Sequence, residues 1–256
     1  MRPPIVFVTD YGRDDAYAAA LTGAVWRIEP RAVCVDGTHG VPPGDVLAGS
    51  YHLKSLAAAF GAGVVLCAVV DPGVGTERRA IAVHAGGVAI VAPDNGLLTY
   101  LWCEAATGDR WAVELETPAW ASNTFHGRDV FAPAAAQLAA GAKLADIGEP
   151  IDDPIVLPEA FARRDVDGVH GRVCVVDHFG NAITTVRSRD LRGARVHGVR
   201  WEGGGTDTVV STYAEISGGV AALFGSAGHL EVSARDAPAA SLGGPRRGAA
   251  ITVLPS

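Results

Sequence analysis

Residues 4–9 read PIVFVT, and residues 10–28 continue as DYGRDDAYAAALTGAVWRI. The first run is short, apolar and rich in β-branched side chains, which is typical of a buried strand. Residues 17–28 follow Asp14 and Asp15 and have the apolar spacing of a helix. A strand, a short polar turn and a helix in this order are typical of α/β folds, in which functional side chains lie where strands end.

The same alternation continues through the first two-thirds of the chain. Apolar runs at residues 32–36, 63–70, 80–85 and 88–92 predict further strands, and residues 43–60 and 129–140 have helical spacing. Because strands separated by helices favour parallel pairing, the predicted fold class is α/β, with a central parallel or mixed sheet.

The composition changes near residues 148–171, where prolines and charged residues form a linker-like stretch. Beyond it, short β-like runs at residues 173–176, 182–186, 206–213, 230–234 and 249–254 are separated by glycine-rich turns. The sequence therefore predicts an N-terminal α/β domain over residues 1–158. A C-terminal all-β domain, a small barrel or sandwich, is expected over residues 159–256.

The composition limits the classes of function. The 256 residues include 21 lysines and arginines against 28 aspartates and glutamates, and this net charge of −7 argues against a nucleic-acid partner. No apolar run approaches the roughly 20 residues that cross a bilayer, and residues 1–10 lack a secretory signal. The four cysteines are scattered singly, which favours free thiols in a reducing compartment. We expect a soluble cytoplasmic enzyme with no membrane partner.

Several catalytic signatures are missing from the sequence. It contains no GxGxxG, no Walker loop, no GxSxG elbow and no HExxH. The sequence therefore argues against phosphate-loop hydrolysis, Rossmann-type dinucleotide binding and serine-hydrolase chemistry. No residues have the spacing of a metal-ligand cluster.

Polar residues instead gather where apolar runs end. They occupy residues 9–15 (TDYGRDD), 71–79 (DPGVGTERR), 122–129 (SNTFHGRD) and 177–181 (DHFGN). Each segment alone could be an ordinary turn or helix cap. Carboxylates, an arginine and a histidine at strand ends are also the side chains that bind ligands and transfer protons.

Six segments, taken in order, have a wider similarity: TDYGRDDAYAAALTGAV, VDPGVGTERR, VAPDNGLLTY, NTFHGRDVFAPAAA, DHFGNAITTV and GSAGHLEVSA. Together they resemble the motifs of the S-adenosylmethionine hydroxide adenosyltransferase family, which is related to the bacterial fluorinase and chlorinase. The resemblance implies an N-terminal α/β domain and a C-terminal β-barrel domain. It also implies a homotrimer that binds its substrate between neighbouring subunits.

The resemblance further implies the reaction and its residues. Water or hydroxide would attack C5′ of S-adenosyl-L-methionine, giving adenosine and L-methionine, with Asp71, Arg78 and His126 as the catalytic set. The residues implied to bind the substrate are Asp10 at the ribose, Asp15 at the methionine ammonium, Phe125, then Asp177, Phe179 and Asn181 from the neighbouring subunit, and Ser226 and Glu231 near the adenine.

These residue types suit the reaction without a cofactor or a metal. The sulfonium leaving group becomes neutral as it departs, so it needs no acid. The protein must align the nucleophile with carbon and sulfur and exclude bulk water. Arg78 and His126 can hold a water molecule and favour its hydroxide-like form. Asp71 can orient that pair or accept the proton, and the sequence leaves the identity of the base open.

Two positions separate the branches of the family. The halogenating enzymes have tyrosine where this chain has His126 and an aromatic residue where it has Asp71. Gly127 alone does not decide, because the chlorinase also has glycine there. Since a carboxylate would repel a halide, Asp71, Arg78 and His126 together favour hydroxide as the nucleophile.

Two other interpretations remain. TDYGRDDAYA resembles the opening of calcium-dependent nucleoside hydrolases, but the first aspartate of that pattern falls at Val8, whose side chain cannot bind calcium. A non-catalytic sensor of adenosine or S-adenosylmethionine would use the same pocket, and only Arg78 and His126 argue against it.

Overall fold

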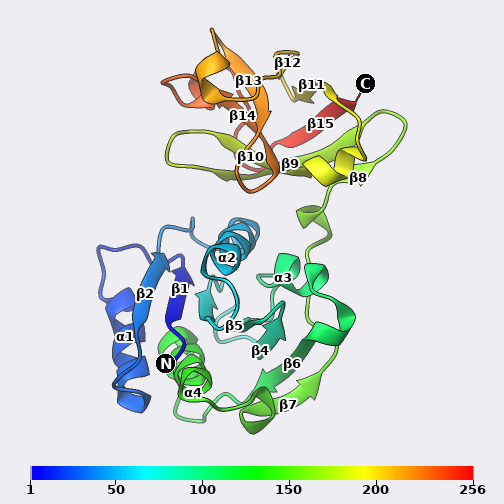
Figure 1. The fold of residues 1–256 in the computed structure, drawn as a ribbon. Coiled ribbons are helices and arrows are strands. Elements are labelled where there is room, and N and C mark those ends of the chain that lie inside the picture. Colours follow the sequence, from blue (N-terminus) through cyan, green and yellow to red (C-terminus); the bar gives the residue numbers. More distant parts are fainter. Residues whose placement is uncertain (1, 256) are drawn as a thin grey trace. The chain divides into compact units, whose positions relative to one another are not determined.

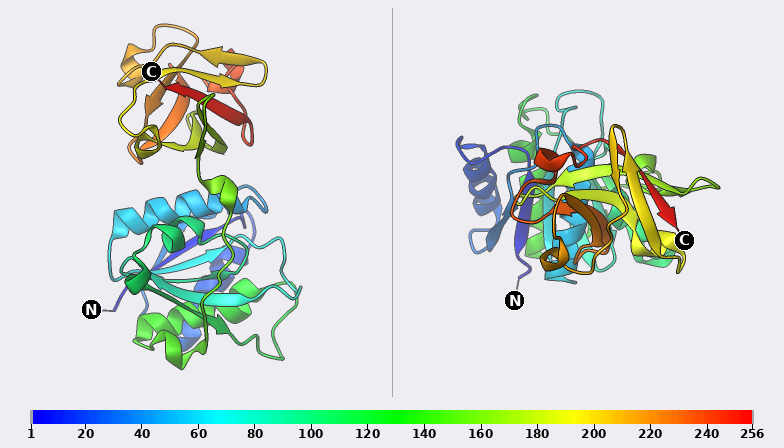
Figure 2. Two further views of the ribbon diagram at one scale, coloured as in Figure 1. Left: turned by 90° about the vertical axis from the view of Figure 1, so that its right-hand side faces the viewer. Right: turned by 90° about the horizontal axis from the view of Figure 1, so that it is seen from above.

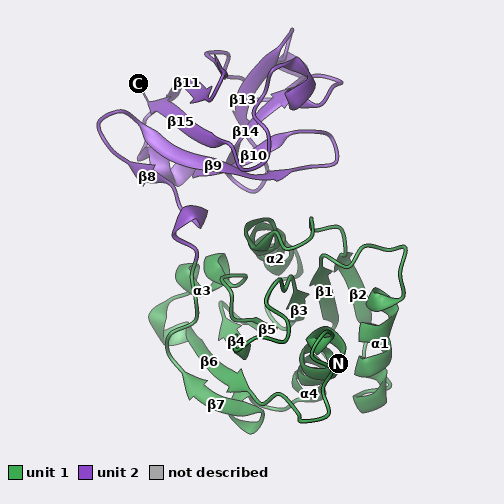
Figure 3. Ribbon diagram, turned by 180° about the vertical axis from the view of Figure 1, so that it is seen from behind, with its two compact units in different colours: residues 1–156 green, residues 157–256 purple. Residues whose placement is uncertain are grey.

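The computed structural model describes residues 2–255, and the chain divides into two compact units, Met1–Val156 and Leu157–Ser256 (Figure 3). The boundary expected from the sequence lay after residue 158. Each unit has its own sheet and its own apolar core. Among residues 2–255, no helix combines the length and the hydropathy that a membrane crossing needs.

The first unit is built on a seven-stranded sheet in the order β2-β1-β3-β5-β4-β6-β7 (Figure 1). Its strands are β1 (Ile5–Thr9), β2 (Cys34–Thr38), β3 (Val65–Val69), β4 (Ala80–Ala85), β5 (Val88–Pro93), β6 (Arg110–Leu115) and β7 (Gly148–Ile151). Strands β2, β1, β3 and β5 are parallel, whereas β4, β6 and β7 pair antiparallel. The predicted α/β class with a mixed central sheet is confirmed.

Helices cover both faces of this sheet. They are α1 (Tyr17–Ile28), α2 (Val46–Phe60), α3 (Thr99–Glu104) and α4 (Ala132–Ala140). Helices α1 and α4 share one core with Ile5 and Phe7 of β1. Helix α2 packs against β1 and β3 from the other side, and Figure 2 shows the two helical layers with the sheet between them. Every residue of β1 is therefore buried, which explains its continuous apolar run.

Parallel pairing also gathers the polar turns at one edge of the sheet. Strands β1, β3 and β5 run in the same direction, so their carboxyl ends lie together. Asp10, Asp71 and Asp94 follow these three ends. This edge is where ligands bind in open α/β sheets.

The second unit is an antiparallel, barrel-like sheet in the order β12-β11-β15-β9-β10-β14-β13, with β8 beside β9. Its strands are β8 (Arg163–Arg164), β9 (Val169–Val176), β10 (Ala182–Arg187), β11 (Val196–Trp201), β12 (Gly204–Thr206), β13 (Val220–Phe224), β14 (His229–Ala234) and β15 (Ala250–Pro255). The segment after β12 bonds to β13, through Ala222 N–H to Thr208 C=O at 2.9 Å and Val210 N–H to Ala222 C=O at 3.0 Å. These bonds nearly close the barrel and confirm the predicted C-terminal all-β barrel.

Several predicted elements differ from the structure. The strand expected over residues 206–213 is wrong: only its first residue lies in a strand, and a 3₁₀ turn at Tyr213–Glu215 follows. Strands β6, β7, β11 and β13 were not predicted. The helix expected over residues 129–140 begins as a π-helical turn, Gly127–Phe131, before α4.

Candidate functional site

A cavity of about 450 Å³ lies in the first unit, where the ends of β1 and β3 meet the loop before α4. Among the residues predicted for the site, Asp10, Asp71, Phe125 and His126 all line it. The other lining residues are Tyr11, Tyr17, Val69, Val74, Ser122, Thr124, Gly127 and Arg128. Two carboxylates beside aromatic rings suit a ligand that is cationic and partly apolar.

Arg78 joins Asp71 to His126. Its Nε donates to both carboxylate oxygens of Asp71, at 3.0 and 3.1 Å, and its Nη2 also donates to this carboxylate. The same Nη2 lies 2.9 Å from Nδ1 of His126. Because a guanidinium can only donate, Nδ1 of His126 must accept. The imidazole is then neutral and carries its proton on Nε2.

The electrostatics agree with this tautomer. Burial lowers the pKa of His126, and the positive charge of Arg78 lowers it further against the opposing carboxylates. The side chains of Asp71 and Arg78 are only 5% and 9% exposed, so their ion pair is shielded from solvent. His126 can therefore donate a hydrogen bond from Nε2, and the nearby carboxylates remain the candidates for accepting a proton.

Hydrogen bonds between its own residues hold the loop that carries His126. His126 directly precedes the π-helical turn Gly127–Phe131, a rare conformation that is frequent at functional sites. Asp129 accepts a hydrogen bond from the Ser122 N–H at 2.9 Å and from Arg128 Nε at 2.7 Å. Arg128 lowers the pKa of Asp129. These bonds fix the loop against the cavity.

Asp10 is anchored by the backbone that precedes α2. Its Oδ2 accepts from the Gly44 N–H at 2.8 Å. Burial raises the pKa of Asp10, and the charge of Asp71 adds to this effect. Asp10 and Asp71 therefore place two mutually repelling carboxylates at one cavity, an arrangement that a cationic ligand would relieve.

A buried relay supports the turn that holds Asp10. The Thr9 hydroxyl lies 2.8 Å from Nδ1 of His39 and accepts from the Tyr11 N–H at 3.2 Å. Nε2 of His39 lies 3.1 Å from Oδ1 of Asp36. Thr9 and His39 are almost fully buried, so the relay ties the end of β1 to the segment after β2.

Asp15 is not part of this arrangement. It is exposed in the turn before α1 and does not line the cavity. Its contact with a methionine ammonium stays a prediction.

The remaining predicted residues lie in the second unit. In the turn between β9 and β10, Asp177 accepts from the backbone N–H groups of Phe179 and Asn181 and from the Asn181 side chain, at 2.9–3.0 Å. Phe179 is 75% exposed at this turn. Glu231 on β14 is buried and accepts from the Tyr213 hydroxyl at 2.7 Å. Ser226 is exposed in the turn between β13 and β14.

Asp177 and Glu231 influence each other electrostatically. Burial raises the pKa of Glu231, the hydrogen bond from Tyr213 opposes this, and the charge of Asp177 raises it further. The structure therefore groups Asp177, Asn181 and Glu231 on one part of the second unit, as it groups Asp10, Asp71 and His126 in the first.

Sequence reasoning missed several residues of these groups. Tyr11 and Tyr17 line the cavity with Phe125, with ring centroids 5.3–5.9 Å apart. The segment TDYGRDDAY contains both tyrosines, and the position of Tyr11 directly after β1 was a usable signal. No comparable signal marks His39 or Tyr213, whose partners are distant in sequence.

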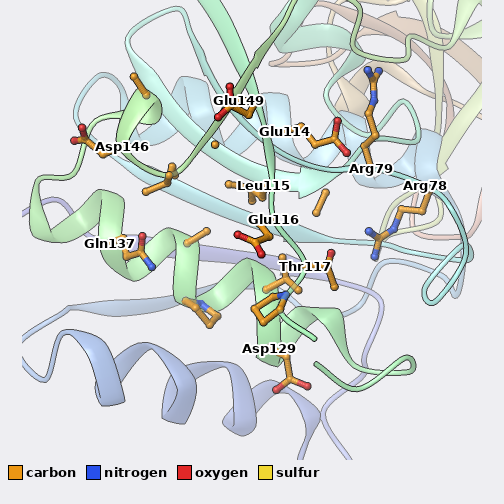
Figure 4. A pocket seen from close by; sticks show the side chains of 18 residues that line it. Arg78, Arg79, Glu114, Leu115, Glu116, Thr117, Asp129, Gln137, Asp146 and Glu149 are labelled. Atoms are coloured by element: carbon orange, nitrogen blue, oxygen red, sulfur yellow. The ribbon is translucent and has the colours of Figure 1, made fainter. Parts of the chain in front are cut away.

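A larger hollow of about 950 Å³ lies on another side of the first unit. Figure 4 shows Glu114, Glu116 and Glu149 around it, with Arg78 and Arg79 at one side. Nη1 of Arg78 is buried and has no hydrogen-bond partner among the described residues. This hollow is wider than the first, but Asp10, Asp71 and His126 do not line it, so the smaller cavity is the candidate site. Within residues 2–255, no group of three or more His, Cys, Asp or Glu is arranged to hold a metal ion.

Comparison with known proteins gives consistent matches over both units. Residues 5–148 match the family model described as the SAM hydroxide adenosyltransferase N-terminal domain, and residues 171–252 match that of the C-terminal domain. The (R)-S-adenosyl-L-methionine hydrolase of Salinispora arenicola is 49% identical over 188 residues, covering 70% of each chain. The enzyme of the same name from Thermus thermophilus is 37% identical and covers 98% of this chain and 99% of its own.

Solved structures agree with these sequence matches. An uncharacterised conserved protein from Thermotoga maritima superposes with a TM-score of 0.87 at 32% identity, covering 98% of this chain and all of that one. Fluorinases from several bacteria are more distant, at 28–31% identity.

Proposed function

Because this chain belongs to the SAM hydroxide adenosyltransferase family, we propose that it hydrolyses (R)-S-adenosyl-L-methionine to adenosine and L-methionine. The relatives named (R)-S-adenosyl-L-methionine hydrolase support the activity. The observation that carries the chemistry is the bonded set Asp71–Arg78–His126 at a cavity with two carboxylates. Neither a nucleoside hydrolase nor a non-catalytic sensor is favoured by these relatives.

The proposed reaction is an in-line displacement at C5′. The oxygen of water or hydroxide forms a bond to C5′ while the C5′–S bond breaks. The electron pair of the broken bond stays on sulfur, which becomes the neutral thioether of methionine. The proton of the attacking water passes to a base. Positive charge disappears at sulfur, so the protein's task is alignment of the three atoms and control of the nucleophile.

The contacts divide the roles within the catalytic set. Arg78 occupies Nδ1 of His126 and so leaves Nε2–H free to donate to the nucleophilic oxygen. Because that nitrogen donates, it cannot also take the proton, and a carboxylate is the acceptor. Asp71 is the nearest one to the pair and fills this role, while the guanidinium stabilises the hydroxide-like oxygen.

Substrate binding extends over both units. Asp10 binds the ribose hydroxyls and, with Asp71, offsets the charge of the sulfonium. Phe125 contacts the substrate in the first unit, and Asp15 binds the methionine ammonium in the loaded enzyme. Asp177, Phe179, Asn181, Ser226 and Glu231 of a neighbouring subunit complete the site in a homotrimer. No metal and no cofactor takes part. The four cysteines are free thiols, which supports a reducing, cytoplasmic location.

The activity is tested by product analysis. Purified protein is incubated with S-adenosyl-L-methionine, and adenosine and methionine are quantified by chromatography with and without a chelator. Equal amounts of both products, unchanged by the chelator, are expected, and in ¹⁸O-labelled water the label appears at the 5′ oxygen of adenosine. Substrate binding without products would support a sensor instead, and loss of activity in chelator would support the calcium enzyme.

The catalytic set is tested by substitution. Arg78→Ala and His126→Ala are each expected to lower kcat by about a hundredfold or more, with KM changed far less, because their effect is on the nucleophile. Equal losses in kcat and in substrate affinity would identify them as binding residues only.

A further inference from the structure

Tyr11 occupies the space into which a side chain at position 127 would project. A Cβ atom built on Gly127 would lie 2.2 Å from the Tyr11 hydroxyl oxygen and 3.2 Å from its ring carbon Cζ. Leu21 blocks the same space from another direction at 3.2 Å. The Tyr11 hydroxyl therefore stands where a side chain at position 127 would begin. A side chain at position 127 would therefore require this hydroxyl to move.

Tyr11 belongs to the candidate site. Tyr11, Asp71, His126 and Gly127 line the same cavity. No described residue hydrogen-bonds to the Tyr11 hydroxyl, although the ring is packed edge-on against Phe125, with centroids 5.8 Å apart. A polar group with a fixed ring and a free hydrogen-bonding capacity is suited to hold a small ligand.

The protonation state of this group is also set by its surroundings. Burial strongly raises the pKa of Tyr11, and the charges of Asp10 and Asp71 raise it further, whereas Arg78 lowers it. The phenol therefore keeps its proton at neutral pH and can donate a hydrogen bond.

We propose that Tyr11 is a further catalytic residue: its hydroxyl, which occupies the space left by the absence of a side chain at Gly127, binds the nucleophilic water beside His126. The inference rests on the proposed hydrolysis. Two donors, the Tyr11 hydroxyl and the His126 Nε2–H, then fix the attacking oxygen. Neither of them accepts the proton that the water loses, which passes to the carboxylate. Tyr11 thereby favours a nucleophile that is small and accepts hydrogen bonds.

Tyr11→Phe removes only the hydroxyl. We expect kcat at saturating substrate to fall about tenfold, the effect of one lost hydrogen bond to a reacting atom, with KM within about twofold of the wild type. The thermal midpoint of unfolding should change little, because no described residue loses a partner. A kcat equal to that of the wild type, or a rise in KM without a fall in kcat, would overturn the proposal.

A double-mutant cycle tests whether the Tyr11 hydroxyl and a side chain at position 127 compete for the same space. Gly127→Ala should lower kcat strongly in the wild-type background, because its methyl group displaces the Tyr11 hydroxyl. In the Tyr11→Phe background the same change should cost less, since the nearest remaining atoms are at 3.2 Å. Independent, additive losses in the two backgrounds would contradict a shared space.

The outcomes separate this inference from the function on which it rests. A wild-type protein that releases no adenosine would overturn the hydrolysis and the role of Tyr11 together. An active wild type with an equally active Tyr11→Phe variant would overturn only the role of Tyr11.

Discussion

At the scale of single residues, His126 shows how one contact sets a chemical role. Its Nδ1 accepts from Arg78, so protonation of this nitrogen would require the hydrogen bond to break. The fall in its pKa, caused first by burial and then by Arg78, keeps the ring neutral. In the proposed reaction His126 is therefore a hydrogen-bond donor and not the base.

This state predicts the acid side of the pH profile. Because the pKa of His126 lies below the ordinary value of 6.5, the active neutral form persists as pH falls through 6.5 and is lost only at lower pH. We expect kcat of the wild type to be nearly flat from pH 7.5 to about 6.5. An acid limb with a midpoint at or above 6.5 that disappears in His126→Asn would contradict this.

Asp10 gives a second prediction at this scale. Asp10→Asn removes the charge but keeps an oxygen that can accept from the Gly44 N–H. We expect KM for S-adenosyl-L-methionine to rise about tenfold, equivalent to about 1.4 kcal/mol, because a ribose contact and an attraction for the sulfonium are lost. Asp14→Asn, in the same turn but outside the cavity, is the control; equal effects of both changes would remove the special role of Asp10.

The sequence could place Asp71 and Arg78 near strand ends because apolar runs mark the strands. Asp71 follows such a run, and Arg78 precedes the next. The contact of Tyr11 with Gly127 could not be found in this way. It depends on the distance between two loops that are far apart in the sequence, and a glycine has many possible causes.

At the scale of elements, the four parallel strands determine where the site lies. Their apolar runs were recognisable because helices bury both faces of the sheet. The antiparallel half of the sheet was harder to predict. In β6 the exposed Glu114 separates the buried residues Val113 and Leu115, so no long apolar run marks this strand. β7 contains Pro150, which is tolerated there because β7 is an edge strand.

The connection between β1 and β2 predicts a stability effect. Thr9→Val keeps the shape of the side chain but removes the hydroxyl shared by His39 and the Tyr11 N–H. Because the His39 ring and the Tyr11 N–H then lose a hydrogen-bond partner away from solvent, we expect the free energy of unfolding, measured in urea, to fall by about 1–3 kcal/mol. Thr9→Ser keeps the hydroxyl and should retain most of that stability. An equal loss in both variants would assign the effect to packing.

At the scale of the whole molecule, the predicted site residues fall into two groups, one in each unit. Asp10, Asp71 and His126 belong to the first unit, and Asp177 and Glu231 to the second. The motifs themselves do not tell which copies of the two units work together, since that depends on assembly, and only the family resemblance implies neighbouring subunits. The proposed trimer answers the question by joining units of neighbouring subunits.

Complementation tests this assembly. Arg78→Ala disables the first-unit half of a site, and Asp177→Ala disables the second-unit half. If each site joins two subunits, co-expression in equal amounts should restore about a quarter of wild-type activity, because about one interface in four then combines two intact halves. If each site belongs to one chain, mixing the two inactive variants restores nothing.

Arg78 has a position that matters beyond the reaction. It bonds to two residues of the smaller cavity and lines the larger acidic hollow as well. The carboxylates of that hollow would attract a basic compound, and a compound bound there would lie beside the arginine that holds Asp71 and His126. Under the proposed function, cationic fragments that bind this hollow are candidates for inhibitors that do not imitate a nucleoside.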